Sequence, residues 1–529
     1  MSTPSLPGAT SRGRTYAFMG GVVATLLTLS VALPLALGDR PQTAPTGGPD
    51  TLAFSTPGPG AALLPSGAPA VSTLPGASPA PGTIRPDGST VPAASGQAAA
   101  PGQSGGQAPG VPAAPDAGGT APVPAGGAAA RTASDQGVTA DSVTLGVFII
   151  DFGRANDVGA SFTGYSPAEQ KNLANAFAAE TNAKGGIAGR RLVLAFQTVD
   201  ILDQQTMRDA CTNFAETDKV FAVTQVLGVY GDPILKCAQD LKLPYLANDG
   251  AVSSYYRQAQ GYIFTTQPST LRTQIAMVRE LVRLGELKGR KVGFLFEDGY
   301  LTADNRATID ELKRNGITPV EGVTSASDVA LALRQIPPIA RDFCTKKVDY
   351  VLYAVNSIYG AQFAQNMERF GCRPAYAMSD FDFTMNGDAF PQDMPNSWFD
   401  RALSITSSRT GEGRVGKPEP AHDVACRQTF QRRTGLVVDR NTAADSKYSS
   451  VVNACTLQEL FAQGFIRAGT NPTRATFVRA LAGLGAFENG NYGPSSFNGK
   501  TDAPDAVRVT RGVLSCKCWQ PQTDFFRPG

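Results

Sequence analysis

The stretch SPAEQKNLANAFAAETNAKGG, residues 166–186, has the beginning, the apolar face and the end of a surface helix. Ser166 is the expected N-cap, Pro167 takes the first helical position, and Glu169 completes a capping box with Ser166. The glycine pair at 185–186 ends the helix. An apolar run lies on either side, and these runs are VTLGVFII (143–150) and LVLAF (192–196). The stretch therefore predicts a helix that links two buried strands.

The same alternation continues along the chain. Further apolar runs predict strands at 220–226, 244–249, 291–298, 348–356, 375–380 and 402–408, and amphipathic segments predict helices at 268–285, 302–315, 421–434, 443–468 and 473–484. Two such sets exceed one sheet, so the expected fold class is α/β, with two doubly wound, Rossmann-like lobes. Ligands of these sheets bind at the carboxyl ends of the strands, and two facing lobes would bring those ends around one cleft.

The composition excludes several classes of protein. The net charge is +2 and charged residues make up 17% of the 529 residues, so no nucleic-acid partner is expected. His422 is the only histidine, which excludes a cluster of histidines around a metal and leaves one candidate base for a catalytic triad. It lies at a predicted helix start, where a capping or solvated role is expected. The eight cysteines, an even number, fit disulfides in an exported protein.

Residues 1–40 have the features of an export signal. Arg12 and Arg14 precede an uncharged run at 15–38, which ends in an acceptable cleavage site at 36–38. The run is also about long enough to span a bilayer, so a cleaved signal peptide and a retained membrane anchor both remain open. Either alternative places the rest of the chain outside the cytoplasm, secreted or anchored at the outer face of the membrane.

Residues 41–135 differ in composition from everything that follows. Residues 41–130 hold 18 of the 38 prolines and only four charged residues, and Gly, Ala, Ser and Thr fill most of the rest. Such a segment cannot bury enough apolar surface to offset its conformational entropy. We expect a disordered tether, which modestly favours a retained anchor because it would let the folded part stand away from the membrane.

Several motifs carry a resemblance to a known family. They are GVTADSVTLGVF near the start of the folded part, NAKGGIAGRRLVL before the second strand, RDACTNF, VFAVTQVLG and GDPILKCAQDLKLPYLAND after it, and YGPSSFNGK at 492–500. Together they resemble the substrate-binding proteins of branched-chain amino acid ABC transporters, which have the type I periplasmic-binding-protein fold. The likeness covers nearly all of 136–529. It implies a small-molecule ligand, an ABC permease as membrane partner, no cofactor, no metal and no enzymatic activity.

The resemblance also implies an organisation for residues 136–529. In that fold the chain crosses between lobes three times, and we expect the crossings near 267, 402 and 490. Lobe one would hold about 140–266 and 403–489, and lobe two about 268–401 and 490–529. The cysteines pair within lobes in this arrangement, as Cys211–Cys237, Cys344–Cys372 and Cys426–Cys455, which leaves Cys516 and Cys518 as the last pair.

Proteins of this family bind both the ammonium and the carboxylate group of an amino acid. The positions of this sequence that match their binding residues define a candidate site. These are Asp151, Gly228, Val229, Tyr230, Asn248, Asp249, Gly250, Tyr300, Asn356, Asp380 and Phe381. Asp380 falls where the family often has the acid that binds the ammonium group. The usual serine near Val229 is missing, and Asp249 would repel a carboxylate. We therefore expect a small polar or amphipathic ligand, amino-acid-like or related, rather than leucine or valine.

The sequence DFDFT, residues 380–384, keeps an enzymatic alternative open. It matches the D-x-D-x-[TV] signature of haloacid dehalogenase-type phosphatases, in which the first Asp attacks phosphorus. That chemistry needs a further acidic pair after a later strand, and Asp388, Asp393 and Asp400 do not supply one convincingly. An EF-hand loop from Asp380 fails because position twelve is Pro391, where a glutamate is required.

A second alternative is a protein of the same fold that does not take part in transport. An anchor followed by a tether also suits a ligand sensor or a cell-surface module that binds a partner. Adjacent genes for permeases and ATPases would favour transport.

Overall fold

The computed structural model describes residues 130–153, 165–200, 203–227, 235–326, 328–381, 394–441 and 447–528. The chain consists of two units that divide near residue 116, and every described residue belongs to the second unit, 117–529. The predicted leader and nearly all of the predicted tether lie outside the described residues. Among the described helices, none combines the length and apolar character that a bilayer crossing requires.

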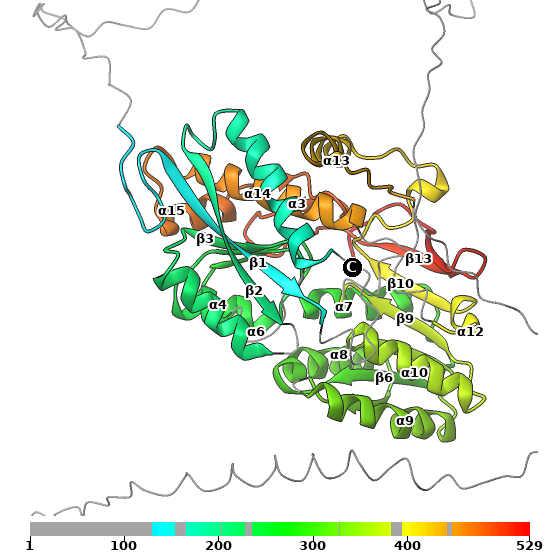
Figure 1. Cartoon of the computed structure of the whole chain (residues 1–529). Helices are drawn as coiled ribbons and strands as arrows, with labels where there is room; N and C mark the ends of the chain where they lie inside the picture. The colour runs from blue at the N-terminus through cyan, green and yellow to red at the C-terminus, as the bar shows by residue number, and fades with distance from the viewer. Residues whose placement is uncertain are drawn as a thin grey trace, which may run out of the picture. The chain divides into compact units, whose positions relative to one another are not determined.

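The first sheet has five parallel strands in the order β2-β1-β3-β4-β5 (Figure 1). Its strands are β1 Ser142–Asp151, β2 Arg191–Asp200, β3 Ala222–Gln225, β4 Tyr245–Ala247 and β5 Ile263–Thr265. Alternate residues of β1 point to opposite faces, as the period of a strand requires. Val147 and Ile149 pack with one group of helices, whereas Phe148 and Ile150 pack with another.

Helices cover both faces of this sheet. One face carries α3 Pro167–Ala183, α13 Ala421–Thr434, α14 Lys447–Arg467 and α15 Arg474–Ala482. The other carries α4 Gln204–Glu216, the short π-helix η1 Lys236–Asp240 and α6 Ser253–Gln258. Helices distant in sequence thus share one core with the N-terminal strands.

The second sheet has seven strands in the order β14-β13-β10-β9-β8-β6-β7. Its strands are β6 Val292–Glu297, β7 Val320–Thr324, β8 Tyr350–Ala354, β9 Ala375–Ser379, β10 Ala402–Thr406, β13 Arg508–Val513 and β14 Cys518–Pro521. The first five are parallel, and β13 and β14 add an antiparallel hairpin next to β10. A two-stranded ribbon stands apart, formed by β11 Ala486–Phe487 and β12 Ser495–Ser496.

Helices also cover both faces of the second sheet. One face carries α9 Val329–Thr345, α10 Ser357–Arg369 and α12 Asn396–Phe399. The other carries α7 Thr270–Arg283 and α8 Thr302–Arg314, which follows the 3-10 turn η2 Gly299–Leu301. A second 3-10 turn, η4 Gly413–Val415, follows β10. Two doubly wound sheets with helices on both faces confirm the predicted fold class.

Two lobe boundaries differ from those expected. β10 pairs with β9 in the second sheet, although residues 403–406 were expected in lobe one. Phe497 and Ala503 pack in a core of the first sheet, although residues after 490 were expected in lobe two. Apolar runs predict that a strand forms but do not show which sheet it joins. The remaining boundaries stay predictions.

All eight cysteines form disulfides, which confirms the three expected pairs and joins the two cysteines whose pairing stayed open. They are Cys211–Cys237, Cys344–Cys372, Cys426–Cys455 and Cys516–Cys518. Each of the first three closes a loop of 26 to 29 residues, which constrains the unfolded chain by roughly 3–4 kcal/mol in the entropy model. Every bridge joins elements of the same lobe, so none of them fixes one lobe to the other.

Candidate ligand-binding site

Three segments lie side by side where the two lobes meet. They are the segment after β5, the segment after β10 and the loop between β11 and β12, and the chain enters the second sheet again at β13. The Gln267 side-chain amide donates to the Tyr492 hydroxyl at 2.7 Å, which joins the first segment to the third. The Gly493 N–H donates to the Ser407 carbonyl at 2.8 Å, which joins the third to the second. The Asn489 amide also reaches the carbonyl of Thr266 at 2.8 Å. The geometry is that of a three-stranded hinge.

A buried polar network lies where β3 and β4 end in the first lobe. The Gln225 amide donates to the Oδ1 of Asn248 and, at 3.1 Å, to the Oδ2 of Asp249. The Tyr245 hydroxyl donates to the Oε1 of Gln225 at 2.8 Å. Burial raises the pKa of Tyr245 well above its ordinary value, and the charge of Asp249 adds to the rise. The predicted site residues Asn248 and Asp249 are thus both held in place by Gln225.

Asp380 follows β9 in the second lobe, at the strand end where the sequence places it. Its side chain is 3% exposed. One carboxylate oxygen accepts from the Thr406 hydroxyl, and the other accepts from the Ser407 N–H at 2.6 Å and from the Ser407 hydroxyl. The backbone N–H of Asp380 donates to Thr273 at 2.9 Å. The carboxylate therefore joins β9 to the second hinge segment, and its contact with a ligand stays a prediction.

Tyr492 brings the acids of the two lobes into one environment. Burial raises the pKa of its hydroxyl well above the ordinary value, and the charges of Asp249 and Asp380 raise it further. Both carboxylates consequently act on the same phenol, although they lie 131 positions apart in the sequence. That Asp249 and Asp380 bind one ligand stays a prediction.

Two further predicted residues have structural roles in the described chain. The N–H of Gly250 lies 3.4 Å from the Oε1 of Gln267, and a Cβ added at Gly250 would lie 2.1 Å from the carbonyl oxygen of Pro268. Only glycine allows the first hinge segment to approach this closely. Asn356 is the N-cap of α10, where its side chain accepts from Ile358.

The remaining predicted residues fall into three groups. Asp151 ends β1 with an exposed side chain that accepts from the Gly153 N–H at 2.9 Å. Tyr300 and Phe381 are half-buried and pack against the core that surrounds α6 of the first lobe. Gly228, Val229 and Tyr230 lie outside the described residues, as do Asp382, Phe383 and Thr384.

The lobes also meet through residues that sequence reasoning did not select. Tyr255 of α6 stacks on Tyr300, with ring centroids 5.9 Å apart and planes at 24°. Asp304 of α8 accepts from the Ser253 N–H at 2.9 Å and from the Thr270 hydroxyl. Asp304 is 5% exposed, so this tie is shielded from water. The periodicity of apolar residues predicts the helix that carries Asp304, but it does not predict that this carboxylate contacts the other lobe.

Glu297 is another acid that the sequence analysis passed over. It ends β6, it is 5% exposed, and its Oε1 accepts from the Asn356 N–H at 2.5 Å. Burial raises the pKa of Tyr359, and the charge of Glu297 raises it further. The signal for Glu297 was present, because it follows an apolar run in KVGFLFED just as Asp380 follows one in AYAMSD.

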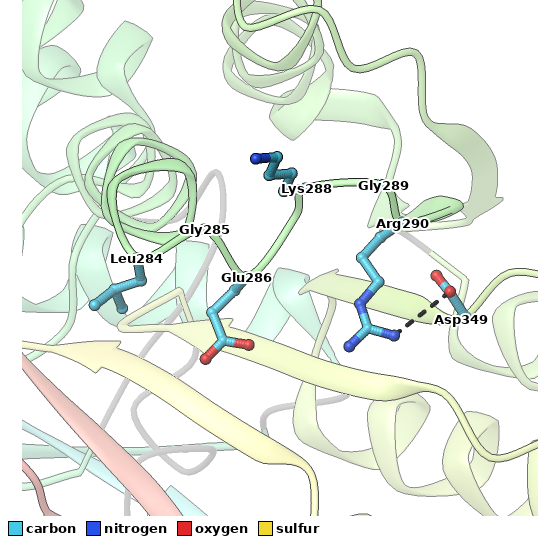
Figure 2. Close-up of a pocket in the computed structure, with 7 residues that line it drawn as sticks. All are labelled: Leu284, Gly285, Glu286, Lys288, Gly289, Arg290 and Asp349. Atoms are coloured by element: carbon cyan, nitrogen blue, oxygen red, sulfur yellow. Dashed lines mark ion pairs between the residues drawn. The ribbon is translucent and has the colours of Figure 1, made fainter.

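Figure 2 shows a polar hollow elsewhere on the second lobe, lined by Leu284, Gly285, Glu286, Lys288, Gly289, Arg290 and Asp349. It is formed by the turn between α7 and β6 and by the residue before β8, where Arg290 pairs with Asp349 at 3.6 Å. These positions precede the strands, whereas doubly wound sheets bind ligands at the opposite, carboxyl edge. The hollow is therefore not the predicted cleft.

The fold has two α/β lobes with three connections between them. Residues 160–386 match the family model described as periplasmic binding protein. This match and the fold support the resemblance to ABC transporter substrate-binding proteins that the sequence motifs carry. None of the curated proteins matches the sequence.

Solved structures show the same fold at low sequence identity. A branched-chain amino acid ABC transporter protein from Thermus thermophilus with bound valine superposes with a TM-score of 0.55 at 14% identity, covering 73% of this chain and 97% of that one. A fatty acid ABC transporter substrate-binding protein from Thermomonospora curvata gives 0.53 at 17% identity, with 74% and 94% covered. A solute-binding protein from Rhodopseudomonas palustris BisB5 in complex with 3,4-dihydroxybenzoic acid gives 0.53 at 14%, with 73% and 98% covered.

Proposed function

We propose that the chain is an extracytoplasmic solute-binding protein that captures a small polar or amphipathic molecule between its lobes and delivers it to an ABC importer. The observation that carries this proposal is the hinge, in which three hydrogen-bonded segments lie where two doubly wound sheets meet. A ligand that bridges two lobes stabilises the closed form by its differential affinity for that form. No bond needs to be made or broken.

The chemistry of the cleft narrows the class of ligand. The solved structures of this fold are described with valine, with 3,4-dihydroxybenzoic acid and as a fatty acid transporter, so the fold itself does not set the ligand. Asp249 and Asp380 bring two buried acids to the hinge region. The negative potential of two carboxylates favours a cation or a molecule rich in hydroxyl groups over a simple anion. Tyr300 and Phe381 would supply apolar contact.

A tethered ligand sensor is the second candidate, favoured by the proline-rich segment at 41–135. Under this alternative the uncharged run at 15–38 would stay in the membrane as an anchor. The two candidates differ in what deletion of the chain does to cells. Loss of uptake of a radiolabelled ligand supports transport, whereas unchanged uptake with a lost transcriptional response supports sensing.

The phosphatase alternative has little support from Asp380. A nucleophilic carboxylate must reach its substrate, whereas this side chain is 3% exposed and accepts hydrogen bonds from Thr406 and Ser407. We propose a binding role without catalysis.

A thermal-shift screen of amino acids, amines, polyols and aromatic acids tests the proposal. We expect at least one class to raise the melting temperature and to compact the lobes in solution scattering. Asp249→Asn should weaken binding of that ligand about 10-fold or more, because hydrogen bonds to charged groups contribute roughly 1.5–3 kcal/mol. Lys288→Ala, in the hollow of Figure 2, is the matched control and should leave affinity unchanged. Compaction with none of the compounds, or affinity lost only in Lys288→Ala, would overturn the cleft assignment.

A further inference from the structure

Four potential metal ligands converge between α13 and α14. His422 and Cys426 lie four residues apart on α13, and Cys455 and Glu459 lie four residues apart on α14. Residues at this spacing share one face of a helix, so each helix presents two ligands to the other. The ligand atoms of all four lie within 4.8 Å of one another. Within the described ranges, this is the one such group that the structure brings together.

The distances fit the edges of a tetrahedron around zinc. Ligand atoms that bind zinc at 2.0–2.3 Å lie about 3.3–3.8 Å from one another. The Nε2 of His422 lies 3.0 Å from Glu459 Oε2 and 3.7 Å from Cys426 Sγ. The Sγ of Cys455 lies 3.7 Å from Glu459 Oε1. Two edges differ, because the contact of His422 with Glu459 is shorter than a zinc-site edge and the two sulfur atoms form a disulfide. His422 and Cys455 also contact different oxygens of the Glu459 carboxylate, which would have to turn to bind a metal through one of them.

A supporting carboxylate stands behind the histidine. The Nδ1 of His422 lies 3.1 Å from Asp423 Oδ1, on the other side of the ring from the Nε2 contact with Glu459. Asp423 is 2% exposed, and the Tyr448 hydroxyl donates to its Oδ2 at 3.4 Å. Zinc-binding histidines usually donate their second ring N–H to such a carboxylate, which fixes the tautomer and the ring orientation. The Cys426–Cys455 disulfide does not require a carboxylate that orients the His422 ring.

We propose that the dithiol form of Cys426 and Cys455 binds Zn²⁺ together with His422 and Glu459, so that the metal and the disulfide are alternative links between α13 and α14. A dithiol reductant supplies two electrons and two protons, the S–S bond breaks, two thiols form, and the reductant leaves as a disulfide. Zn²⁺ then displaces the two thiol protons and binds both thiolates, the Nε2 of His422 and the carboxylate of Glu459. Two cysteines, one histidine and one carboxylate suit zinc in particular.

Cobalt titration of the full-length protein tests the site. After reduction with an excess of a dithiol and removal of the reductant without oxygen, one equivalent of Co²⁺ should give the absorption of tetrahedral cobalt with a thiolate charge-transfer band. Zn²⁺ should displace it. The oxidised protein should give neither band. His422→Ala and Glu459→Gln should weaken Co²⁺ binding at least 10-fold, and Asp423→Asn about 10- to 100-fold through loss of support for the imidazole.

Two cysteine-pair variants separate this site from other thiols. Cys426→Ser/Cys455→Ser should lose the cobalt bands, whereas Cys344→Ser/Cys372→Ser, which removes another disulfide of similar loop length, should keep them. If reduction unfolds the chain, Zn²⁺ must restore the fold in the wild type and not in Cys426→Ser/Cys455→Ser. Absent cobalt bands in the folded dithiol protein, bands that persist in Cys426→Ser/Cys455→Ser, or a reduced chain that stays unfolded with Zn²⁺ would each overturn the proposal.

Discussion

Asp380 illustrates how one buried carboxylate organises a hinge. Burial of an ion is costly unless hydrogen bonds replace its hydration. Here the Thr406 hydroxyl and both the N–H and the hydroxyl of Ser407 donate to the carboxylate. These donors belong to the end of β10 and to the segment that leaves it. The interaction therefore fixes the path of the chain at the point where it leaves the second sheet.

Asp380→Asn is expected to destabilise the protein by about 1–3 kcal/mol. The amide nitrogen cannot accept, so at least one of the three donors loses its acceptor in a buried position. Urea unfolding followed by circular dichroism measures the change. Asp400→Asn is the control, because Asp400 is exposed, and it should change the free energy of unfolding by less than about 0.5 kcal/mol. Equal stability of the two variants would show that the Asp380 contacts are not stabilising.

The sequence predicts the position of Asp380 better than its partners. An apolar run that ends in an acid places Asp380 after a strand, and β9 ends one residue before it. Its contacts with Thr406 and Ser407 depend on how β9 and β10 are paired, which local periodicity does not encode. The same limit applies to the contacts of Asp304 and to the cluster of His422, Cys426, Cys455 and Glu459 on α13 and α14. The expected Cys426–Cys455 disulfide places the two helices side by side, but the sequence does not show that His422 and Glu459 lie on the same side of that bridge.

At the scale of elements, local chemistry predicts long segments well and short ones poorly. The capping box at Ser166 and the strand β1 follow from sequence signals that act within a few residues. β5 has only three residues, and β13 and β14 contain charged or polar residues in place of an apolar run. These strands form because the sheet edge supplies hydrogen-bond partners, so their own sequences give little sign of them.

Ser166→Ala is expected to destabilise the protein by about 0.5–2 kcal/mol at neutral pH, through loss of the cap on α3. The Ser166 hydroxyl accepts from the Glu169 N–H at 3.3 Å, and Glu169 Oε2 accepts from the Ser166 N–H at 2.8 Å. Ser269→Ala is the control, since Ser269 begins α7 without a side-chain capping bond. A loss as large in Ser269→Ala as in Ser166→Ala would argue against the capping explanation.

The effect of Ser166→Ala should decrease in acid. The Ser166 N–H, which Ser166→Ala keeps, and the Ser166 hydroxyl, which it removes, both hold the pKa of Glu169 below its ordinary value. A carboxyl with a lowered folded-state pKa contributes stability above its unfolded-state pKa and loses it as the pH falls through the folded-state value. Urea unfolding of wild type and variant at pH 7 and pH 3 should therefore give a smaller difference at pH 3. If the difference were independent of pH, the cap would depend only on the hydrogen bond that the Ser166 hydroxyl accepts from the Glu169 N–H.

At the scale of the whole molecule, the disulfides lie within lobes, whereas one core is shared between the lobes. Leu301, Tyr300 and Phe381 of the second lobe pack in the core around α6, next to the hydrogen bonds of Asp304 and the aromatic pair Tyr255–Tyr300. This distribution of contacts suits two rigid bodies that open and close. It also means that a small change at the lobe contact shifts the equilibrium without unfolding either core.

Tyr300→Ala is expected to loosen the contact between the lobes. An aromatic pair contributes about 0.5–1.5 kcal/mol beyond its buried area, so its loss should raise amide hydrogen exchange in α6, residues 253–258, roughly 2- to 10-fold. Exchange in α14, residues 447–467, should stay as in the wild type, because its residues pack in cores of the first lobe that do not include Tyr300. Leu284→Ala, at the exposed end of α7, serves as control and should leave exchange in α6 unchanged. If Tyr300→Ala instead raised exchange in α14 and α6 alike, Tyr300 would belong to the stability of the fold, and closure of the lobes would have to depend on other contacts.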